Sequence, residues 1–182
     1  FKRIDLAPGV TPSAHLNVIA DRAENLVISD ELLAQHRALV PQAHALFGAR
    51  HYGHYDFLFT LSDSTGHFGL EHHQSSDDRV GAEYFTDPET YLHARMLLPH
   101  EYVHSWNGKF RRPASLTTPN FNVPMKDDLL WVYEGLTEYL GDVLAARSGL
   151  WTTEQYRNNL AVTAARMSGV TGRSWRPLQD TN

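Results

Sequence analysis

The chain contains no cysteine among its 182 residues. Without thiols it forms neither a disulfide nor a thiolate metal site. Any transition-metal ligands must therefore be histidine or carboxylate side chains. Oxidising and reducing compartments are equally compatible with this absence.

Long apolar runs and clusters of basic residues are also lacking. No stretch approaches the roughly 20 apolar residues that a membrane-spanning helix needs. The net charge is −5 with histidines neutral, which makes nucleic acid an unfavourable partner. Composition is otherwise that of a globular protein, long enough for one domain with a sizeable core, 1–182. The sequence does not fix the oligomeric state.

Neither end of the sequence has the features expected of a natural chain terminus. Residue 1 is Phe rather than Met, and the chain stops on the polar segment Gln179–Asn182 without a closing element. We therefore expect a piece of a longer protein.

The first 50 residues predict a strand and a helix. Residues 1–13 are expected to form an entry loop, and Ala14–Ala20 alternates as a strand does. A helix should begin after the capping residue Ser29 and end at Gly48. Pro41 is expected to kink or split it.

A β-hairpin is predicted next, from Tyr52–Ser62 and His67–His72, followed by an irregular segment, Gln74–Tyr84. Gly69 lies inside the second strand, where glycine often marks close approach of another backbone. Glu71 lies on the same side of that strand. Either this is an exposed edge that pairs with an extended peptide and aims Glu71 at its end, or it is a plain hairpin with a solvated Glu71.

The stretch HEYVH follows on a predicted helix, Asp87–Trp106, in which Pro99 should produce a kink. His100 and His104 lie four residues apart and share one helix face, so two imidazoles can bind one Zn²⁺. Glu101 then lies beside the ion, where it can take a proton from water. The alternative is one packing histidine and one solvated histidine.

A catalytic zinc needs a third protein ligand. One peptidase class supplies a histidine ten residues after the first, but that position is Phe110 here. Another class takes a glutamate from a following helix. After the long loop Lys109–Met125, the helix Leu129–Arg147 carries Glu134 and Glu138 on one face, and its Gly135 suggests close packing of a neighbouring helix.

The rest of the chain predicts one more helix, begun by a cap at Thr152 and ending near Met167, and then an irregular tail, Arg173–Pro177.

Three separate motifs occur in order: FGLEH, HEYVHSWNGK and WVYEGLTEYL. Together they resemble the glycyl aminopeptidase family of zinc peptidases, in the gluzincin group with thermolysin and the aminopeptidase N type enzymes. The similarity runs from about His15 to the C-terminus. It implies an α+β, thermolysin-like catalytic domain, in which a small antiparallel or mixed sheet is followed by helices that carry the metal ligands.

The resemblance also implies roles for individual residues. His100, His104 and Glu134 would bind Zn²⁺, and Glu101 would be the general base. Glu71, with Gly69 beside it, would recognise the free amine of a peptide that begins with glycine or alanine. Independently of the resemblance, Glu138 lies one turn after Glu134 and is either a candidate acceptor for the N–H of a ligating histidine or a solvated helix carboxylate.

The sequence departs from the family pattern at two positions. Phe68 stands where the family strand commonly has a first glycine, and Pro99 precedes the first ligand. The N-terminal β domain, the later helical region and the PDZ-like domain of family members have no counterpart in these 182 residues. None of Tyr133, Tyr139 and Tyr156 matches the tyrosine that stabilises the transition state in related aminopeptidases.

The function expected from these observations is zinc-dependent hydrolysis of N-terminal residues from peptides. The alternatives are a thermolysin-type zinc endopeptidase and a non-catalytic peptide-binding domain with a vestigial metal site. Either the cytoplasm or the periplasm of a bacterium would suit such a chain.

Overall fold

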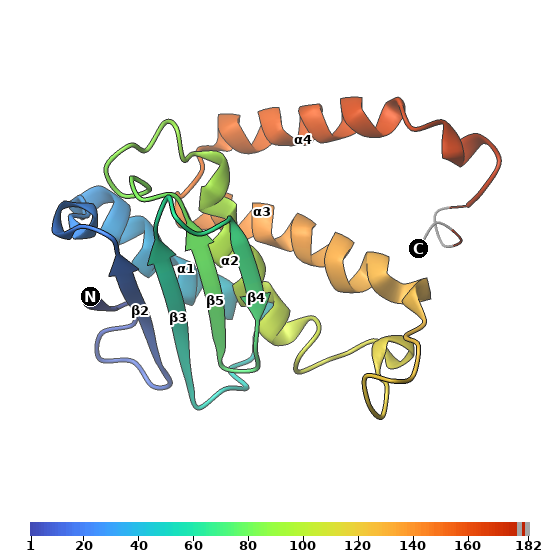
Figure 1. The fold of residues 1–182 in the computed structure, drawn as a ribbon, viewed down its shortest axis with the longest axis horizontal. Coiled ribbons are helices and arrows are strands. Elements are labelled where there is room, and N and C mark those ends of the chain that lie inside the picture. The colour runs from blue at the N-terminus through green and yellow to red at the C-terminus, as the bar shows by residue number, and fades with distance from the viewer. Residues whose placement is uncertain (178–179, 181–182) are drawn as a thin grey trace.

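The computed structural model describes residues 1–177 and 180, and its centre is a five-stranded mixed sheet (Figure 1). The spatial order of the strands is β1-β2-β3-β5-β4. The strands are β1 (Lys2–Asp5), β2 (Ser13–Ala20), β3 (His54–Leu61), β4 (Phe68–Glu71) and β5 (Ser75–Val80). Strands β2, β3 and β5 are parallel, while β1 and β4 run antiparallel to their neighbours at the two edges.

Three sequence predictions for this sheet are wrong. The expected entry loop contains β1, and the expected hairpin of β3 with β4 does not form, because β5 pairs with both strands and separates them. Strand β5, with the sequence SSDDRV, lies inside the segment Gln74–Tyr84 that is predicted to be irregular, and aspartate is indeed depleted in strands. Two residues of β5, Ser76 and Asp78, are buried as a polar pair. The Ser76 hydroxyl donates to a carboxylate oxygen of Asp78 at 2.7 Å.

Helices α1 (Asp30–Phe47) and α2 (Leu97–Trp106) cover one face of the sheet, and α3 (Leu136–Ser148) packs on both of them (Figure 1). As the sequence predicts, the Ser29 hydroxyl caps α1. The helix runs through Pro41 without a split and ends at Gly48 with φ +66°. Large side chains that are fully buried in the core include Tyr55, Tyr84, Tyr102, Phe57, Phe59, Leu98 and Leu144.

Helix α2 begins much later than predicted. Only a 3-10 turn, His93–Met96, precedes Leu97, and the residues from Asp87 onward form turns. Pro99 therefore lies in the first turn of α2. Backbone N–H groups there have no acceptor within the helix, so the N–H that proline lacks removes no hydrogen bond. The predicted kink one turn before His100 is wrong, because proline here accompanies the start of the helix.

The approach to α3 is also irregular. A 3-10 turn at Asp127–Leu129 and a π-helical turn at Trp131–Gly135 precede it, where the sequence predicts one continuous helix. Gly135 has no neighbouring atom within 4 Å of the place where a Cβ would stand, so the close packing predicted there is wrong. Gly141 has that role instead, because a Cβ there would lie 3.1 Å from the Cα of His100.

Helix α4 (Thr153–Ser168) extends from the body as an arm (Figure 1). A capping box of Thr152 and Gln155 begins it as predicted, and none of its residues is buried. The predicted irregular tail includes a 3-10 turn, Thr171–Ser174. The polar C-terminal segment lies outside the described residues except for Asp180. Among the residues described, no helix is both long and apolar enough to cross a membrane.

The same substitution at two glycines should have opposite effects on stability. Gly141→Ala forces a methyl group against the backbone of α2, which should lower the free energy of unfolding by about 1–3 kcal/mol. Gly135→Ala meets no atom and gains helix propensity, so it should raise stability by up to about 1 kcal/mol. Urea unfolding of the two variants checks both signs. Equal stability of the two variants would contradict the packing role of Gly141.

Candidate metal centre

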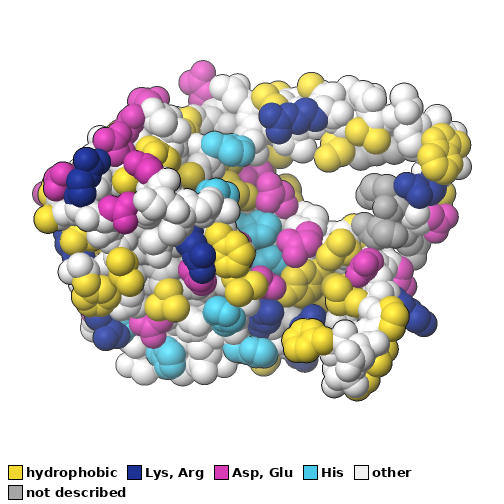
Figure 2. Space-filling model, viewed as in Figure 1, with side chains coloured by type: hydrophobic (Ala, Val, Ile, Leu, Met, Phe, Trp, Pro, Cys, Tyr) yellow, Lys and Arg dark blue, Asp and Glu magenta, His cyan; other side chains and the backbone are white. Residues whose placement is uncertain are grey.

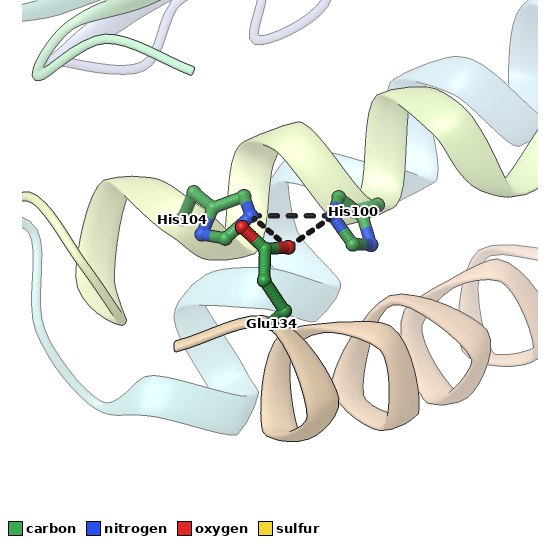
Figure 3. Close-up of side chains that lie close together, drawn as sticks. All are labelled: His100, His104 and Glu134. Atoms are coloured by element: carbon green, nitrogen blue, oxygen red, sulfur yellow. Dashed lines mark hydrogen bonds and ion pairs between the residues drawn. The ribbon is translucent and has the colours of Figure 1, made fainter. Parts of the chain in front are cut away.

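Three side chains from two neighbouring elements point at one another (Figure 3). The Nε2 atoms of His100 and His104, one turn apart on α2, are 3.2 Å from each other. The Oε2 atom of Glu134 lies 3.5 Å from the first and 3.4 Å from the second. These three atoms form a nearly equilateral triangle, so the structure brings together the residues that the sequence nominated as metal ligands.

The triangle fits a tetrahedral zinc ion. Bonds of about 2.0–2.1 Å from imidazole nitrogen and carboxylate oxygen place ligand atoms about 3.3 Å apart at tetrahedral angles. Two nitrogens and one oxygen are the donor set of a catalytic zinc site, which keeps its fourth position for water or substrate. Side-chain type and spacing therefore both fit the ion.

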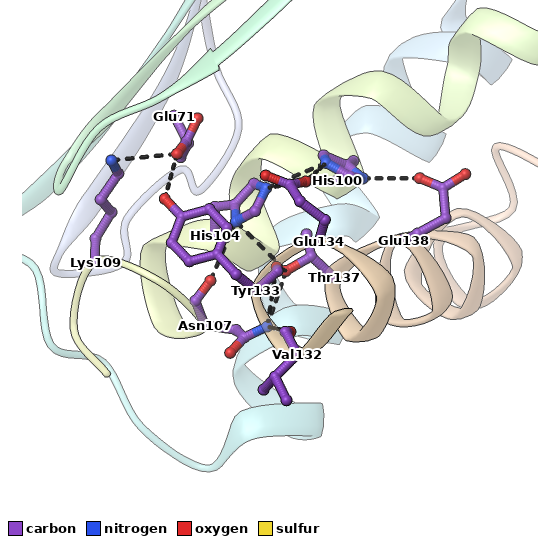
Figure 4. Close-up of polar contacts among 10 residues, drawn as sticks. All are labelled: Glu71, His100, His104, Asn107, Lys109, Val132, Tyr133, Glu134, Thr137 and Glu138. Carbon is purple, nitrogen blue, oxygen red and sulfur yellow. Dashed lines mark hydrogen bonds and ion pairs between the residues drawn. The ribbon is translucent and has the colours of Figure 1, made fainter. Parts of the chain in front are cut away.

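The second nitrogen of each histidine is also occupied (Figure 4). His104 Nδ1 lies 3.1 Å from the backbone oxygen of Asn107, and His100 Nδ1 lies 3.0 Å from Glu138 Oε2. When the His104 Nδ1–H donates to its oxygen, the lone pair of that imidazole is on Nε2, inside the triangle. Glu138 lies within ion-pair distance of His100, on the side of the ring away from the triangle.

Asn107 and Thr137 secure the turn that carries Glu134. The Asn107 side-chain amide donates to the backbone oxygen of Val132 at 2.8 Å and to the Thr137 hydroxyl at 3.0 Å. The Thr137 hydroxyl in turn donates to the backbone oxygen of Tyr133 at 2.7 Å. A π-helical turn is common at functional sites and needs such support. Sequence reasoning missed both residues, although each lies inside a motif, Asn107 directly after HEYVHSW.

Protonation states differ sharply across the cluster. Burial disfavours a charged His100, but its contacts with Glu134 and Glu138 outweigh burial and raise the pKa of His100 to about 10. The bonds from His100 and His104 lower the pKa of Glu134 to about 2. Both shifts favour a charged His100 beside an ionised Glu134. A metal ion that binds His100 displaces the proton of the charged form, because a ligating nitrogen must be neutral.

Glu101 lies outside the triangle, with its carboxylate pressed against the edge strand β4. It is 5% exposed, and burial raises its pKa to about 7 despite the two nearby histidines. A Cβ on Gly69 would stand only 2.0 Å from Glu101 Oε1. The close approach predicted at Gly69 is thus made by a side chain and not by another backbone.

A second group could in principle hold a cation, since ligand atoms of Glu71, Glu101 and His104 also lie within 4.8 Å of one another. His104 can offer only Nε2, because its Nδ1 donates to Asn107, and one lone pair binds one ion. Glu71 also has an internal cation in contact, Lys109 Nζ at 3.2 Å from its Oε1. The triangle with Glu134 is therefore the better metal site.

Glu71 lies at the end of edge strand β4, with two donors on one of its oxygens (Figure 4). The hydroxyl of Tyr133 donates to Oε1, and Lys109 reaches the same atom. Burial favours the neutral carboxyl, but these donors outweigh it, and the pKa of Glu71 is lowered. Neither Tyr133 nor Lys109 was predicted to contact Glu71, although both stand inside the quoted motifs.

Histidine and acidic side chains line the open face of the molecule beside α3 (Figure 2). They form a polar strip beside the sheet. Exposed fractions of 48% and 59% for the Glu134 and Glu138 side chains show that solvent reaches these two carboxylates.

Comparison with known proteins gives a family match and matches to solved structures. The family model of M61 glycyl aminopeptidase matches residues 93–182. The chain also resembles a crystal structure of an aminopeptidase N family protein from Idiomarina loihiensis, with a TM-score of 0.62 and 25% sequence identity over 85% of this chain. The similarity covers 27% of that longer chain, so this chain spans about a quarter of its relative. None of the curated proteins compared matches.

A methyl group at Gly69 should disable Glu101 without touching the triangle. Gly69→Ala must displace the buried Glu101 carboxylate, and misplacing a reacting group by about 1 Å costs on the order of 100-fold in rate. If the chain has the zinc peptidase activity proposed in the next subsection, hydrolysis of a glycine anilide should fall by about that factor, while bound zinc per chain, measured by atomic absorption, should not change. Gly66→Ala is the matched control, because a Cβ there meets nothing within 4 Å. Equal rates for the two variants would be evidence against a placement role for Gly69.

Proposed function

This chain belongs to the glycyl aminopeptidase family, and from that premise we propose that it is the catalytic part of a zinc-dependent aminopeptidase. The mixed sheet followed by ligand-bearing helices would be its thermolysin-like, gluzincin-type domain. His100, His104 and Glu134 would hold the zinc ion. Peptides with a free N-terminus, preferably beginning with glycine or alanine, would be the substrates.

One observation carries this proposal, the triangle of two imidazole nitrogens and one carboxylate oxygen with edges of 3.2–3.5 Å. Structural zinc sites usually fill all four positions with cysteine or histidine, and the chain has no cysteine. Among the residues that the structure describes, three ligands converge here, which supports a catalytic rather than a structural ion.

Glu101 would act as the proton carrier. Zinc, when bound, supplies Lewis-acid chemistry that acidifies water and polarises the scissile carbonyl. The Glu101 carboxylate would take a proton from the attacking water and later give it to the leaving amine. A pKa near 7 suits both transfers, since such a group accepts and returns a proton at neutral pH.

Strand β4 would align the substrate. As an edge strand it has one side without a neighbouring strand, so the backbone of an extended peptide can pair with it. Glu71 at the end of β4 would accept the terminal ammonium group. Attack would then be limited to the first peptide bond, which is what distinguishes an aminopeptidase.

A thermolysin-type endopeptidase is the second candidate, and one observation favours it. Lys109 already neutralises Glu71, and a paired carboxylate attracts a terminal ammonium less strongly than a free one. The two candidates share the metal site and the role of Glu101, and they differ in whether Glu71 reads the free amine.

Two substitutions should distinguish the role of Glu101 as the general base from the role of Glu134 as a metal ligand. Glu101→Gln removes the proton acceptor but no ligand, so zinc should remain at one per chain while turnover of glycine anilide falls by about 100-fold or more. Glu134→Ala removes a ligand and should weaken zinc binding, which competition with a fluorescent chelator measures. Full activity of Glu101→Gln would remove Glu101 as the base, and unchanged zinc affinity of Glu134→Ala would place the third ligand elsewhere.

Blocked and unblocked peptides test the aminopeptidase proposal. The Glu71→Gln variant should raise KM for a free-amine peptide at least several-fold, because a charge-assisted contact is lost, and leave an N-acetylated peptide unaffected. Initial rates for the two peptides measure the ratio. Efficient cleavage of the acetylated peptide by the unsubstituted protein would favour the endopeptidase.

A further inference from the structure

The carboxylate proposed to receive a substrate ammonium already contacts an ammonium of its own chain. Lys109 Nζ is 3.2 Å from Glu71 Oε1, and the two side chains are only 17% and 15% exposed (Figure 4). A pair so far withdrawn from water is screened less than a surface ion pair. Lys109 is thus a resident cation at Glu71.

The backbone holds Lys109 in a defined place relative to the metal cluster. Just after α2, the Lys109 N–H donates to the carbonyl of His104 at 3.0 Å. Gly108 adopts φ +132°, and its N–H donates to Arg111 at 2.7 Å. This turn fixes the direction in which the Lys109 side chain leaves the backbone, and that direction leads to β4.

Tyr133 adds a second donor to the same oxygen, and its ring lies against His104 with 4.8 Å between ring centres. One carboxylate thus accepts from a hydroxyl and an ammonium before any ligand arrives. A ligand ammonium at Glu71 comes within a few ångströms of Lys109 Nζ, and like charges at that distance repel. Binding of the ligand is therefore an exchange of one cation for another.

We propose that Lys109 is a specificity-determining residue that competes with the terminal ammonium of the substrate for Glu71. This inference rests on the proposed function. Competition by Lys109 lowers the affinity of Glu71 for an isolated ammonium group. A peptide whose backbone also pairs with β4 gains enough further contacts to displace Lys109, so the site favours peptides over free amines.

The test is a binding measurement that needs no turnover. Glycinamide carries the ammonium group, and N-acetylglycinamide is the matched ligand without it. Calorimetric titration of the zinc-loaded chain should show that Lys109→Met binds glycinamide about 3- to 10-fold more tightly, because the competing charge is gone. The Kd of N-acetylglycinamide should not change.

Two controls keep the charge separate from other effects. Lys109→Arg retains the cation and should bind glycinamide as the unsubstituted chain does. Lys126→Met makes the same charge change at an exposed position and should also leave the Kd unchanged. Lys109→Gln is a second neutral variant, in case Lys109→Met does not fold.

A double-mutant cycle shows whether the effect passes through Glu71. In a Glu71→Gln background, Lys109→Met should no longer tighten glycinamide binding, because nothing remains to compete for. The proposal is overturned if both neutral variants, Lys109→Met and Lys109→Gln, bind glycinamide as tightly as the unsubstituted chain or more weakly. It is also overturned if these variants bind glycinamide and N-acetylglycinamide more tightly by the same factor, or if no variant binds glycinamide. If the variants show the expected changes in Kd but the unsubstituted chain does not hydrolyse peptides, only the proposed function is contradicted.

Discussion

The close packing of α2 on α3 is the contact on which the rest of the site depends. Gly141 brings the second helix against the backbone of His100, at the level where the first imidazole leaves α2. The π-helical turn before α3 then carries Glu134 to both imidazoles. A triangle of ligand atoms with edges near 3.3 Å tolerates little separation of the two elements, since an ångström of movement is a large fraction of a metal–ligand bond.

Negative charge is concentrated around the cluster. The carboxylates of Glu71, Glu101, Glu134 and Glu138 surround two imidazoles, and those of Glu71 and Glu101 are largely withdrawn from water. Groups of the chain itself compensate this charge, because the pKa values of His100 and Glu101 are raised and the ammonium of Lys109 contacts Glu71.

Local signals in the sequence succeeded where the structure is determined locally. Ser29 and Gly48 mark the two ends of α1, and Thr152 caps the start of α4. Buried and more exposed residues alternate along β2 and β3, as they do in half-buried strands. Predictions failed where distant residues decide. Strand β5 is polar yet central, because β3 and β4 supply its partners, and Pro99 stands near a helix start that the upstream residues do not reveal.

By itself, the sequence determined the donor set: two histidines four residues apart, a glutamate beside them, no thiols and a second acidic helix. Helical periodicity and side-chain chemistry suffice for that, since both act over a few residues. Only the tertiary structure decided that Glu134 reaches both Nε2 atoms while Glu138 contacts His100 from the other side, and that Lys109 and Tyr133 share one oxygen of Glu71. Those contacts join residues far apart in the chain, and their distances follow from how helices and sheet pack, which no local pattern encodes.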